Sequence, residues 1–258
     1  MIINLYRHRG YIFRTAWAEV RHRYAGAGLG AVWNILQPLA MILVFTLVFT
    51  QLMDRESMGN VAYPIYLCTA LLPWAAFSEC INRGTQSFVS HAIYLRKLPI
   101  PEQVFVAQSA VGTAISLTIS FAVLVVFSLA LGHMPSWHWA LVPVPLVLFL
   151  SFAFGIGMAL GTLNAFIRDV GQAVPIFLQI GFWTYPIVYP MRVLPEPVQA
   201  AMKFNPVYPY MEGIRSLFIH RELPEPWMWA AMAGWAALSS LAGYLILRRL
   251  RPELRDVI

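Results

Sequence analysis

Long apolar runs, separated by short polar and charged segments, dominate the chain. Their lengths are typical of helices that cross a membrane, because about 20 apolar residues span its hydrocarbon core. The 65 residues between Glu102 and Arg168 contain no Asp, Glu, Lys or Arg, which is too many for one span, and the turn at 132–136 divides them. The pattern predicts an all-α integral membrane protein with six transmembrane helices, at 33–53, 61–82, 103–131, 138–167, 170–191 and 227–247.

The stretch 151–190 consists of two apolar segments joined by one charged pair, Arg168 and Asp169. We expect this pair in a tight turn at a membrane surface, because charges are costly in the bilayer core. The second segment is interrupted by Pro175, Pro186 and Pro190, which remove helical hydrogen bonds. Broken helices in membranes are tolerated only against protein or a water-filled cavity. The stretch therefore favours the wall of a pathway, with a wet cavity beside the freed carbonyls.

Residues 1–30 predict an interface helix followed by a glycine-rich turn into the bilayer. Apolar residues recur at helical spacing, and they are Ile3, Tyr6, Phe13, Trp17, Val20 and Tyr24. Arg7, Arg14 and Arg21 recur every seven residues on another face. This pattern is typical of a helix that lies in the plane of the lipid headgroups. Such a helix either only fixes orientation, or also guides a substrate or contacts a partner.

The segment 192–226 differs from the spans, with six prolines and eight charges in 35 residues. Two apolar runs remain in it, and each follows a proline that can open a short helix. We expect two short helices at 196–204 and 209–219 that dip into one membrane face without crossing it.

Composition supports the membrane class, because 59% of the residues are hydrophobic and only 12% are charged. Soluble domains carry about 25% charged residues. The net charge of +6 reflects orientation rather than binding to nucleic acid, because 13 of the 18 Lys and Arg residues lie on the side of the two termini and 5 on the other. Cytoplasmic loops carry the excess of Lys and Arg, so we expect both termini in the cytoplasm.

The sequence contains no recognisable catalytic constellation. The six histidines are scattered, and no Cys/His spacing indicates a metal site. Cys68 and Cys80 lie twelve positions apart on one predicted helix, about 18 Å by the helical rise and too far for a disulfide. No G-x-x-x-x-G-K-[ST] motif occurs, so the chain is not expected to bind ATP itself. Glu79 and Arg83, one helical turn apart, predict an ion pair at the cytoplasmic end of a span.

Three blocks of sequence resemble one known family. The first block contains Arg23, Tyr24, Leu29, Gly30, Trp33 and Pro38. The second is the run from Leu95 to Pro101. The third runs from Gly155 through Gly157, Gly161, Asn164, Arg168 and Asp169 to Phe177, Trp183, Pro186, Tyr189, Asn205 and Pro206. In these blocks the chain resembles the membrane subunit of a two-component ABC exporter for lipid-linked polysaccharides, the Wzm type of O-antigen permease, and it is similar to capsule and teichoic acid permeases.

The resemblance implies a homodimer in the bacterial cytoplasmic (inner) membrane, with a separate ATPase bound to each subunit. ATP and Mg²⁺ would bind to that ATPase, and this chain would carry no cofactor. A coupling helix at 85–98 would dock on the ATPase, and the helices of 196–219 would form an external gate. The implied coupling residues are Phe88, Ile93, Tyr94, Leu95, Arg96 and Lys97.

The implied substrate is a polyprenyl-pyrophosphate-linked glycan, which would enter near the interface helix and leave through the dimer channel. Aromatic rings offer weak, exchangeable contacts to the faces of sugars. The candidates for lining the channel are Trp33, Phe45, Phe49, Phe177, Trp183 and Tyr185, with packing or lipid contact as the alternative. Arg7, Arg14, Arg21 and Arg23 would hold the pyrophosphate or, alternatively, anionic lipid headgroups.

Three other functions remain open. The first is an ABC exporter permease for capsule polysaccharide, teichoic acid, or a small lipid or drug. A membrane-embedded glycosyltransferase would need paired carboxylates or a metal site, and the predicted cytoplasmic loops offer only Glu102 and Asp169. A secondary transporter would need ionisable groups within the bilayer, which are nearly absent.

Overall fold

The computed structural model describes residues 1–22, 61–97 and 99–257, together with seven single positions between 36 and 48. Most of the predicted first span lies outside these residues, and so do Arg23, Trp33, Phe45 and Phe49. The seven positions are all helical and exposed, and they are Leu36, Leu39, Ala40, Leu43, Val44, Leu47 and Val48. Within the described part of the chain all regular structure is helical, which agrees with the predicted class.

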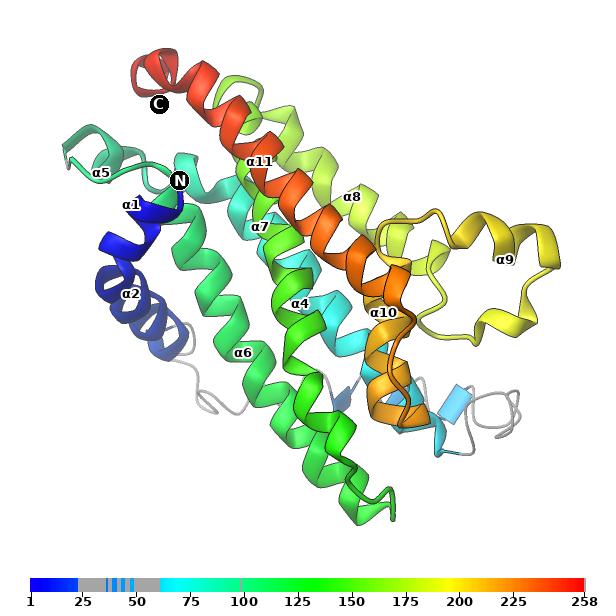
Figure 1. Ribbon diagram of the computed structural model, residues 1–258. Helices are drawn as coiled ribbons and strands as arrows, with labels where there is room; N and C mark the ends of the chain where they lie inside the picture. Colours follow the sequence, from blue (N-terminus) through cyan, green and yellow to red (C-terminus); the bar gives the residue numbers. More distant parts are fainter. Residues whose placement is uncertain are drawn as a thin grey trace.

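The helices follow one another with short connections (Figure 1). At the N-terminal end lie α1 (Ile2–Arg7) and α2 (Arg9–His22), and next come α4 (Tyr63–Ser90), α5 (Ala92–Lys97) and α6 (Gln103–Ala130). The middle of the chain forms η3 (Trp137–Leu141), α7 (Pro143–Phe166) and α8 (Asp169–Thr184). The last part forms η4 (Met191–Val193), α9 (Glu196–Met202), α10 (Tyr208–Arg215), the π-helical turn η5 (Ser216–His220) and α11 (Pro226–Val257). Prolines occupy the first turns of α4, α7, α9 and α10, where a missing N–H costs no helical hydrogen bond.

Four helical segments of the described residues are long and apolar enough to cross a membrane: α4, α6, α11 and the continuous segment Trp137–Phe166. The helix α8 is shorter, because its 16 residues extend only about 24 Å. It ends at Thr184 rather than at 191, since Tyr185 adopts an extended backbone before Pro186. A residue before proline is disfavoured in the helical region, so the helix ends where the sequence places this proline.

The predicted coupling helix at 85–98 is not one separate helix. Its first part belongs to α4, which continues to Ser90. The chain turns at His91, and α5 then covers Ala92–Lys97. The last turns of α4 and the short helix α5 therefore form one connected unit.

The helix α7 lies at the centre of the bundle and packs against both α4 and α11. Gly84 of α4 faces Gly157 and Gly161 of α7, and a Cβ placed on Gly161 would lie 2.5 Å from the Gly84 carbonyl oxygen. On the other face of α7, Gly155 and Gly243 bring the backbones of α7 and α11 into direct contact. Small residues allow this close approach in membranes, where backbone packing replaces much of the hydrophobic driving force.

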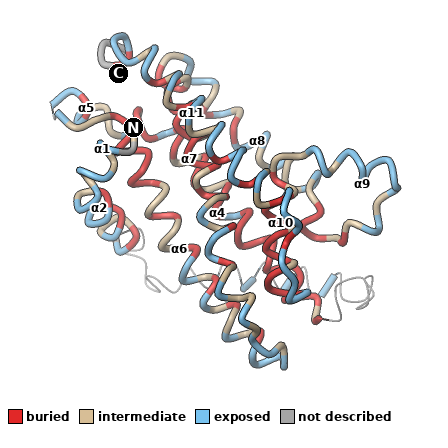
Figure 2. The backbone as a smooth tube through the Cα atoms, in the orientation of Figure 1, coloured by how far each residue is buried: buried red, intermediate tan, exposed pale blue. Residues whose placement is uncertain are grey.

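The buried residues form two clusters. The larger one surrounds α4, α7 and α10 (Figure 2), whereas α9 and the outer side of α11 are exposed. The smaller cluster joins Phe88, Leu95, Phe105, Leu247 and Leu254. Both termini and α5 lie at the same end of the bundle (Figure 1), and this arrangement places the interface helix, α5 and the end of α11 on one side.

Candidate functional site

The short helix α5 presents an exposed surface at the end of the molecule where the two termini lie. Ile93 is 68% exposed and Tyr94 is 54% exposed. Arg96 and Lys97 are exposed as well. We call these four residues, Ile93, Tyr94, Arg96 and Lys97, the α5 surface. It combines two large apolar side chains with two positive charges.

Phe88 and Leu95 were predicted as coupling residues, but both are fully buried. They belong to the smaller core cluster, in which they pack with residues of α6 and α11. Their side chains fix the α5 surface from behind and are not accessible to a partner. His91 adds to this support, since its ring lies 5.1 Å from that of Phe105 and its Nδ1 lies 2.9 Å from the Ser87 carbonyl oxygen.

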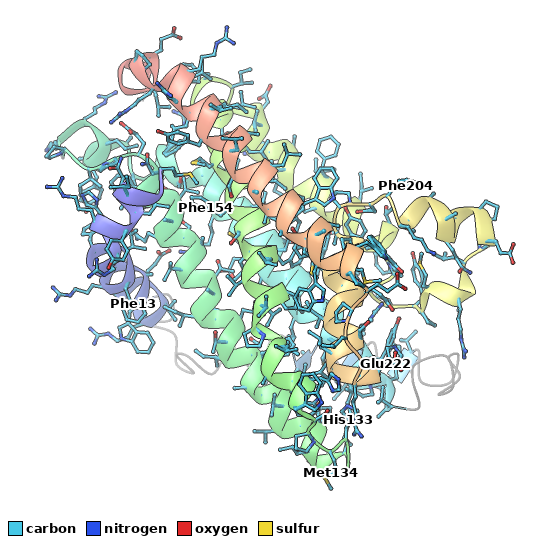
Figure 3. All side chains as sticks on the ribbon, viewed as in Figure 1. Phe13, His133, Met134, Phe154, Phe204 and Glu222 are labelled. Atoms are coloured by element: carbon cyan, nitrogen blue, oxygen red, sulfur yellow. The ribbon has the colours of Figure 1, made fainter. Side chains whose placement is uncertain are left out.

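The interface helix has two apolar faces rather than the single stripe that the sequence predicts, and it is broken at His8 into α1 and α2. Ile12, Ala16 and Val20 are buried, and α2 packs against α6. The opposite apolar face is exposed and consists of Ile3, Tyr6, Phe13 and Trp17 (Figure 3 labels Phe13). Arg7, Arg14 and Arg21 are exposed beside it. Val20 therefore belongs to the packing face, and the remaining stripe is free to contact lipid.

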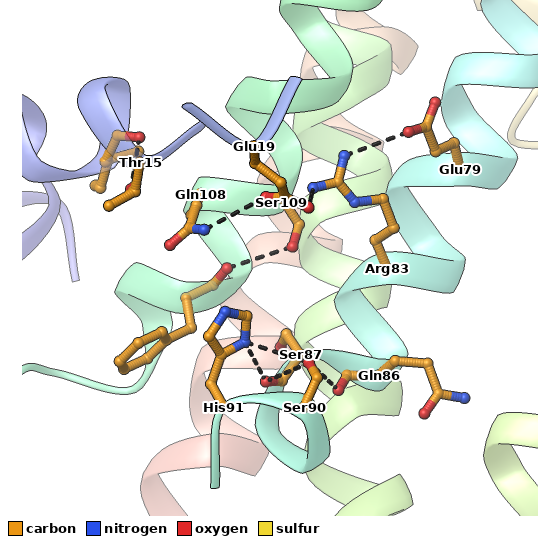
Figure 4. A network of polar contacts seen from close by, with 12 residues as sticks. Thr15, Glu19, Glu79, Arg83, Gln86, Ser87, Ser90, His91, Gln108 and Ser109 are labelled. Atoms are coloured by element: carbon orange, nitrogen blue, oxygen red, sulfur yellow. Dashed lines mark hydrogen bonds and ion pairs between the residues drawn. The ribbon is translucent and has the colours of Figure 1, made fainter. Parts of the chain in front are cut away.

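A polar network holds α2 against the bundle (Figure 4). Arg83 of α4 forms a close ion pair with Glu19 of α2 and a second one, of 3.3 Å, with Glu79. Gln108 of α6 donates a hydrogen bond of 3.3 Å to the other carboxylate oxygen of Glu19. The predicted pair of Glu79 and Arg83 within α4 is thus present, and Glu19 of α2 and Gln108 of α6 extend it to two further helices. The side chains are only partly exposed, so the network specifies how the three helices meet.

The exposed face of α8 carries two of the predicted channel aromatics. Phe177 is 72% exposed and Trp183 is 54% exposed. Tyr185 behaves differently, since its ring packs edge-on against Trp74 of α4 with centroids 4.8 Å apart. Phe177 and Trp183 are therefore available for a ligand or for another subunit, whereas Tyr185 ties the end of α8 to α4.

The segment 185–190 after α8 has its backbone carbonyls satisfied by protein groups. Arg215 of α10 donates to the Ile187 carbonyl at 3.0 Å. Tyr63 and Tyr66 of α4 donate to the carbonyls of Val188 and Tyr189, at 3.0 and 3.3 Å. The guanidinium of Arg215 also lies 4.0 Å from the centre of the Tyr66 ring. These contacts fix the segment after α8 on α4 and α10, and a wet cavity beside α8 stays a prediction.

The π-helical turn η5 is held by the connection between α6 and α7. The Phe218 carbonyl oxygen accepts a hydrogen bond of 3.0 Å from the Trp139 indole and lies 2.9 Å from His133 Nε2. The rings of Trp139 and Phe218 stack with centroids 4.2 Å apart. His133 therefore fixes one end of the segment formed by α10 and η5.

Tyr208 links α10 to the start of α11. Its ring stacks with that of Trp227 at a centroid distance of 6.4 Å. Burial raises the pKa of Tyr208 to about 12, and the nearby carboxylates of Glu212 and Glu225 act in the same direction. Tyr208 therefore remains a neutral phenol over the physiological pH range.

Arg168 and Asp169 lie exposed in the turn between α7 and α8. Asp169 is the first residue of α8, where a negative charge complements the positive end of the helix dipole. Among the described residues there is no group of three or more His, Cys, Asp and Glu side chains that could hold a metal ion.

Comparison with known proteins gives the family. The model of the ABC-2 type transporter family matches residues 11–219. The chain belongs to this family.

The chain is similar to three named transport proteins. It is 27% identical to the O-antigen export system permease protein RfbA of Myxococcus xanthus over 260 residues, which cover 100% of this chain and 99% of that protein. The identity to the RfbA protein of Klebsiella pneumoniae is also 27%, over 86% of this chain and 87% of the relative. The polysialic acid transport protein KpsM of Escherichia coli is 22% identical over 75% of each chain.

Two charged residues of this ABC-2 chain are central to its packing, although their roles were not predicted. Glu19 lies in a predicted helix whose pattern is dominated by arginines and aromatic residues, and that pattern gave no indication of its role. Arg215 and Glu212 are the two charged residues of the run 210–219, and a charge in such a run is a signal that it has a specific partner. The sequence could not identify these partners, because they lie far away along the chain.

Proposed function

We propose that this chain is the channel-forming subunit of an ATP-driven exporter that moves a lipid-linked polysaccharide across the bacterial cytoplasmic membrane. The named functions of its relatives support this substrate class, since they export O-antigen or transport polysialic acid. The match over the whole length of the Myxococcus protein favours an O-antigen-like polymer. Capsule polysaccharide is the second candidate, and the similarity to KpsM supports it.

The observation that carries the proposal is the α5 surface. Ile93 and Tyr94 are large apolar side chains left in the open at the end of the molecule where both termini lie. The buried side chains of Phe88 and Leu95 hold this surface rigidly on α4 and α6. A separate ATPase, which would carry the ATP and the Mg²⁺, binds at this surface in our proposal. Movements of the ATPase would then reach α4 directly, because α5 follows α4 after a single turn at His91.

The complete exporter would contain two copies of this chain and two ATPase subunits. Phe177, Ile180 and Trp183 leave one side of α8 exposed and apolar, with Gln179 among them. Such a face suits either a second subunit or a sugar chain, since aromatic rings can contact the C–H faces of sugars. Arg7, Arg14 and Arg21 lie beside the exposed apolar stripe of α1 and α2, where a pyrophosphate or an anionic headgroup would meet them.

The docking proposal can be tested on the complex with its ATPase. We expect the double substitution Ile93→Ala and Tyr94→Ala to weaken binding of the ATPase, because buried interface anchors are worth on the order of 2 kcal/mol each. A loss of about 2 kcal/mol at each position corresponds to roughly 30-fold in the dissociation constant for one substitution and to about 1,000-fold for the pair if the two losses add. The measurement is the amount of ATPase that co-purifies with the membrane subunit, followed by titration of the two purified components.

Phe204→Ala is the matched control. Phe204 is 87% exposed between α9 and α10 (Figure 3), and its substitution should leave ATPase binding unchanged. Undiminished binding and export by the double variant would show that the ATPase docks elsewhere. Absence of any ATPase from the wild-type complex would contradict the proposed function itself.

A further inference from the structure

Asn164 is a buried amide near the end of α7 that bonds to two other helices. It is 2% exposed. Its Nδ2 donates a hydrogen bond of 3.0 Å to the Thr85 carbonyl of α4 and a longer one, of 3.4 Å, to Gln86 Oε1. Its Oδ1 accepts a hydrogen bond of 2.8 Å from the backbone N–H of Gly171 in α8. One side chain therefore joins the last turns of α4 to the first turn of α8.

The approach of the three helices at this point is as close as their backbones allow. A Cβ placed on Gly171 would lie 2.6 Å from Asn164 Oδ1 and 2.6 Å from Gln86 Nε2. Any residue larger than glycine would thus displace the amide or the start of α8. First-turn N–H groups lack an i−4 partner in their own helix. The Gly171 N–H reaches the Arg168 carbonyl at 3.2 Å, and Asn164 supplies a second, shorter acceptor from α7. Its position makes the orientation of α8 dependent on α4.

The α4 side of the contact is equally well fixed. Thr85 is 1% exposed, and its hydroxyl donates to the Ile81 carbonyl at 2.8 Å. Gly84, the preceding residue, lies against Gly157 and Gly161 of α7. From Thr85 the helix continues without interruption to Ser90, and α5 follows after His91. A displacement of α5 consequently moves the carbonyl to which Asn164 is bonded.

We propose that Asn164 is a positioning residue that couples movement of the α5 surface to α8. The inference rests on the proposed function, in which an ATPase binds α5 and α8 borders the transport path. A buried amide with three bonds is suited to this role, because a shift of about 1 Å breaks a hydrogen bond unless its partner follows. The start of α8 therefore moves with the end of α4, and each ATPase cycle changes the path.

The test uses the membrane subunit in complex with its ATPase and measures the polysaccharide exported per ATP hydrolysed. Asn164→Leu keeps the number of side-chain heavy atoms and the branch at Cγ, and it removes all three hydrogen bonds. We expect this variant to assemble with the ATPase and hydrolyse ATP, while export per ATP falls at least tenfold. Thr162→Val is the matched control, since Thr162 is fully buried two positions earlier and its hydroxyl bonds only to Met158 of the same helix. This control should leave the ratio unchanged.

Asn164→Asp is a second variant for the case that the leucine variant does not reach the membrane. It keeps the acceptor for the Gly171 N–H and loses the donor to Thr85, so export per ATP should fall severalfold. A ratio within twofold of wild type in a variant that assembles overturns the role of Asn164, and so does an equal fall in the Thr162→Val control. If the wild-type complex exported no polysaccharide, the proposed function would fail instead, which separates the two outcomes.

Discussion

Arg215, the last residue of α10, brings a charged side chain into the protein interior, where it is 2% exposed. Removal of a guanidinium from water costs several kcal/mol unless the charge is compensated. A charge-assisted hydrogen bond to the Ile187 carbonyl and the face of the Tyr66 ring both offset this cost. Arg215 thereby joins α10, α4 and the segment after α8 at one point. These contacts fix the position of α10 on the bundle.

The glycine contacts between α4 and α7 lead to a prediction about stability. Gly161→Ala should destabilise the protein by about 1–3 kcal/mol, because overpacked cores lose that much when backbones are forced apart. A Cβ at this position would meet the Gly84 carbonyl oxygen at 2.5 Å. The measurement is thermal unfolding of the purified protein in detergent.

Gly234→Ala in α11 serves as the control for this prediction, since a Cβ at position 234 would meet nothing within 4 Å. It should be neutral, or stabilising by up to about 1 kcal/mol through helix propensity. Equal effects of the two substitutions would mean that the helix crossing tolerates a wider separation.

At the scale of elements, α8 and the segment after it contain two aromatic residues with different tasks. Trp183 is exposed, whereas Tyr185 packs on Trp74. Their separation of two positions would place them on different faces of a regular helix, and the extended backbone at Tyr185 turns the chain inward at this point. The end of the helix thus separates a residue that can contact a substrate from one that supports the wall.

Alanine substitutions at these two positions should therefore have different consequences. Trp183→Ala should assemble normally with the ATPase but export severalfold less polysaccharide, since it removes an exposed ring contact worth about 1 kcal/mol. Tyr185→Ala should lower the amount of complex in the membrane, because loss of a packed aromatic ring costs about 3 kcal/mol or more. Surface polysaccharide is measured beside the membrane level of the complex.

Tyr185→Phe is the control for the second substitution, because it keeps the ring against Trp74 and should assemble normally. Full export by a normally assembled Trp183→Ala variant would remove Trp183 from the transport path and leave α8 as a structural wall.

For the whole molecule, the charge distribution predicts that both termini face the cytoplasm. The termini and α5 lie at one end of the bundle (Figure 1), so they must all face the same side of the membrane. In a variant without Cys68 and Cys80, Ser90→Cys should react with an impermeant thiol reagent only in permeabilised cells. Pro197→Cys should react in intact cells.

Both test positions are exposed, and this matters for the experiment. Ser87 would be unsuitable, since it is 1% exposed and would remain unlabelled on either side. Labelling of Ser90→Cys in intact cells, with Pro197→Cys protected, would reverse the orientation and place the α5 surface outside.

The helical class and the regions of the long helices follow from the sequence because they depend on local properties. A run of uncharged residues must find an apolar environment, and its backbone must satisfy its own hydrogen bonds there, so a helix results wherever the run is long enough. The same local chemistry predicts the ion pair of Arg83 with Glu79 one turn away.

Only the tertiary structure decided which residues from distant parts of the chain meet. It turned Phe88 and Leu95 inward, brought Glu19 to Arg83, and placed Asn164 between Thr85 and Gly171. It also bonded the carbonyls of residues 187–189 to Arg215, Tyr63 and Tyr66. Helical periodicity gives the face on which a side chain lies but not the helix that it faces. That choice depends on how closely the backbones approach, and here the glycines of α7 determine it.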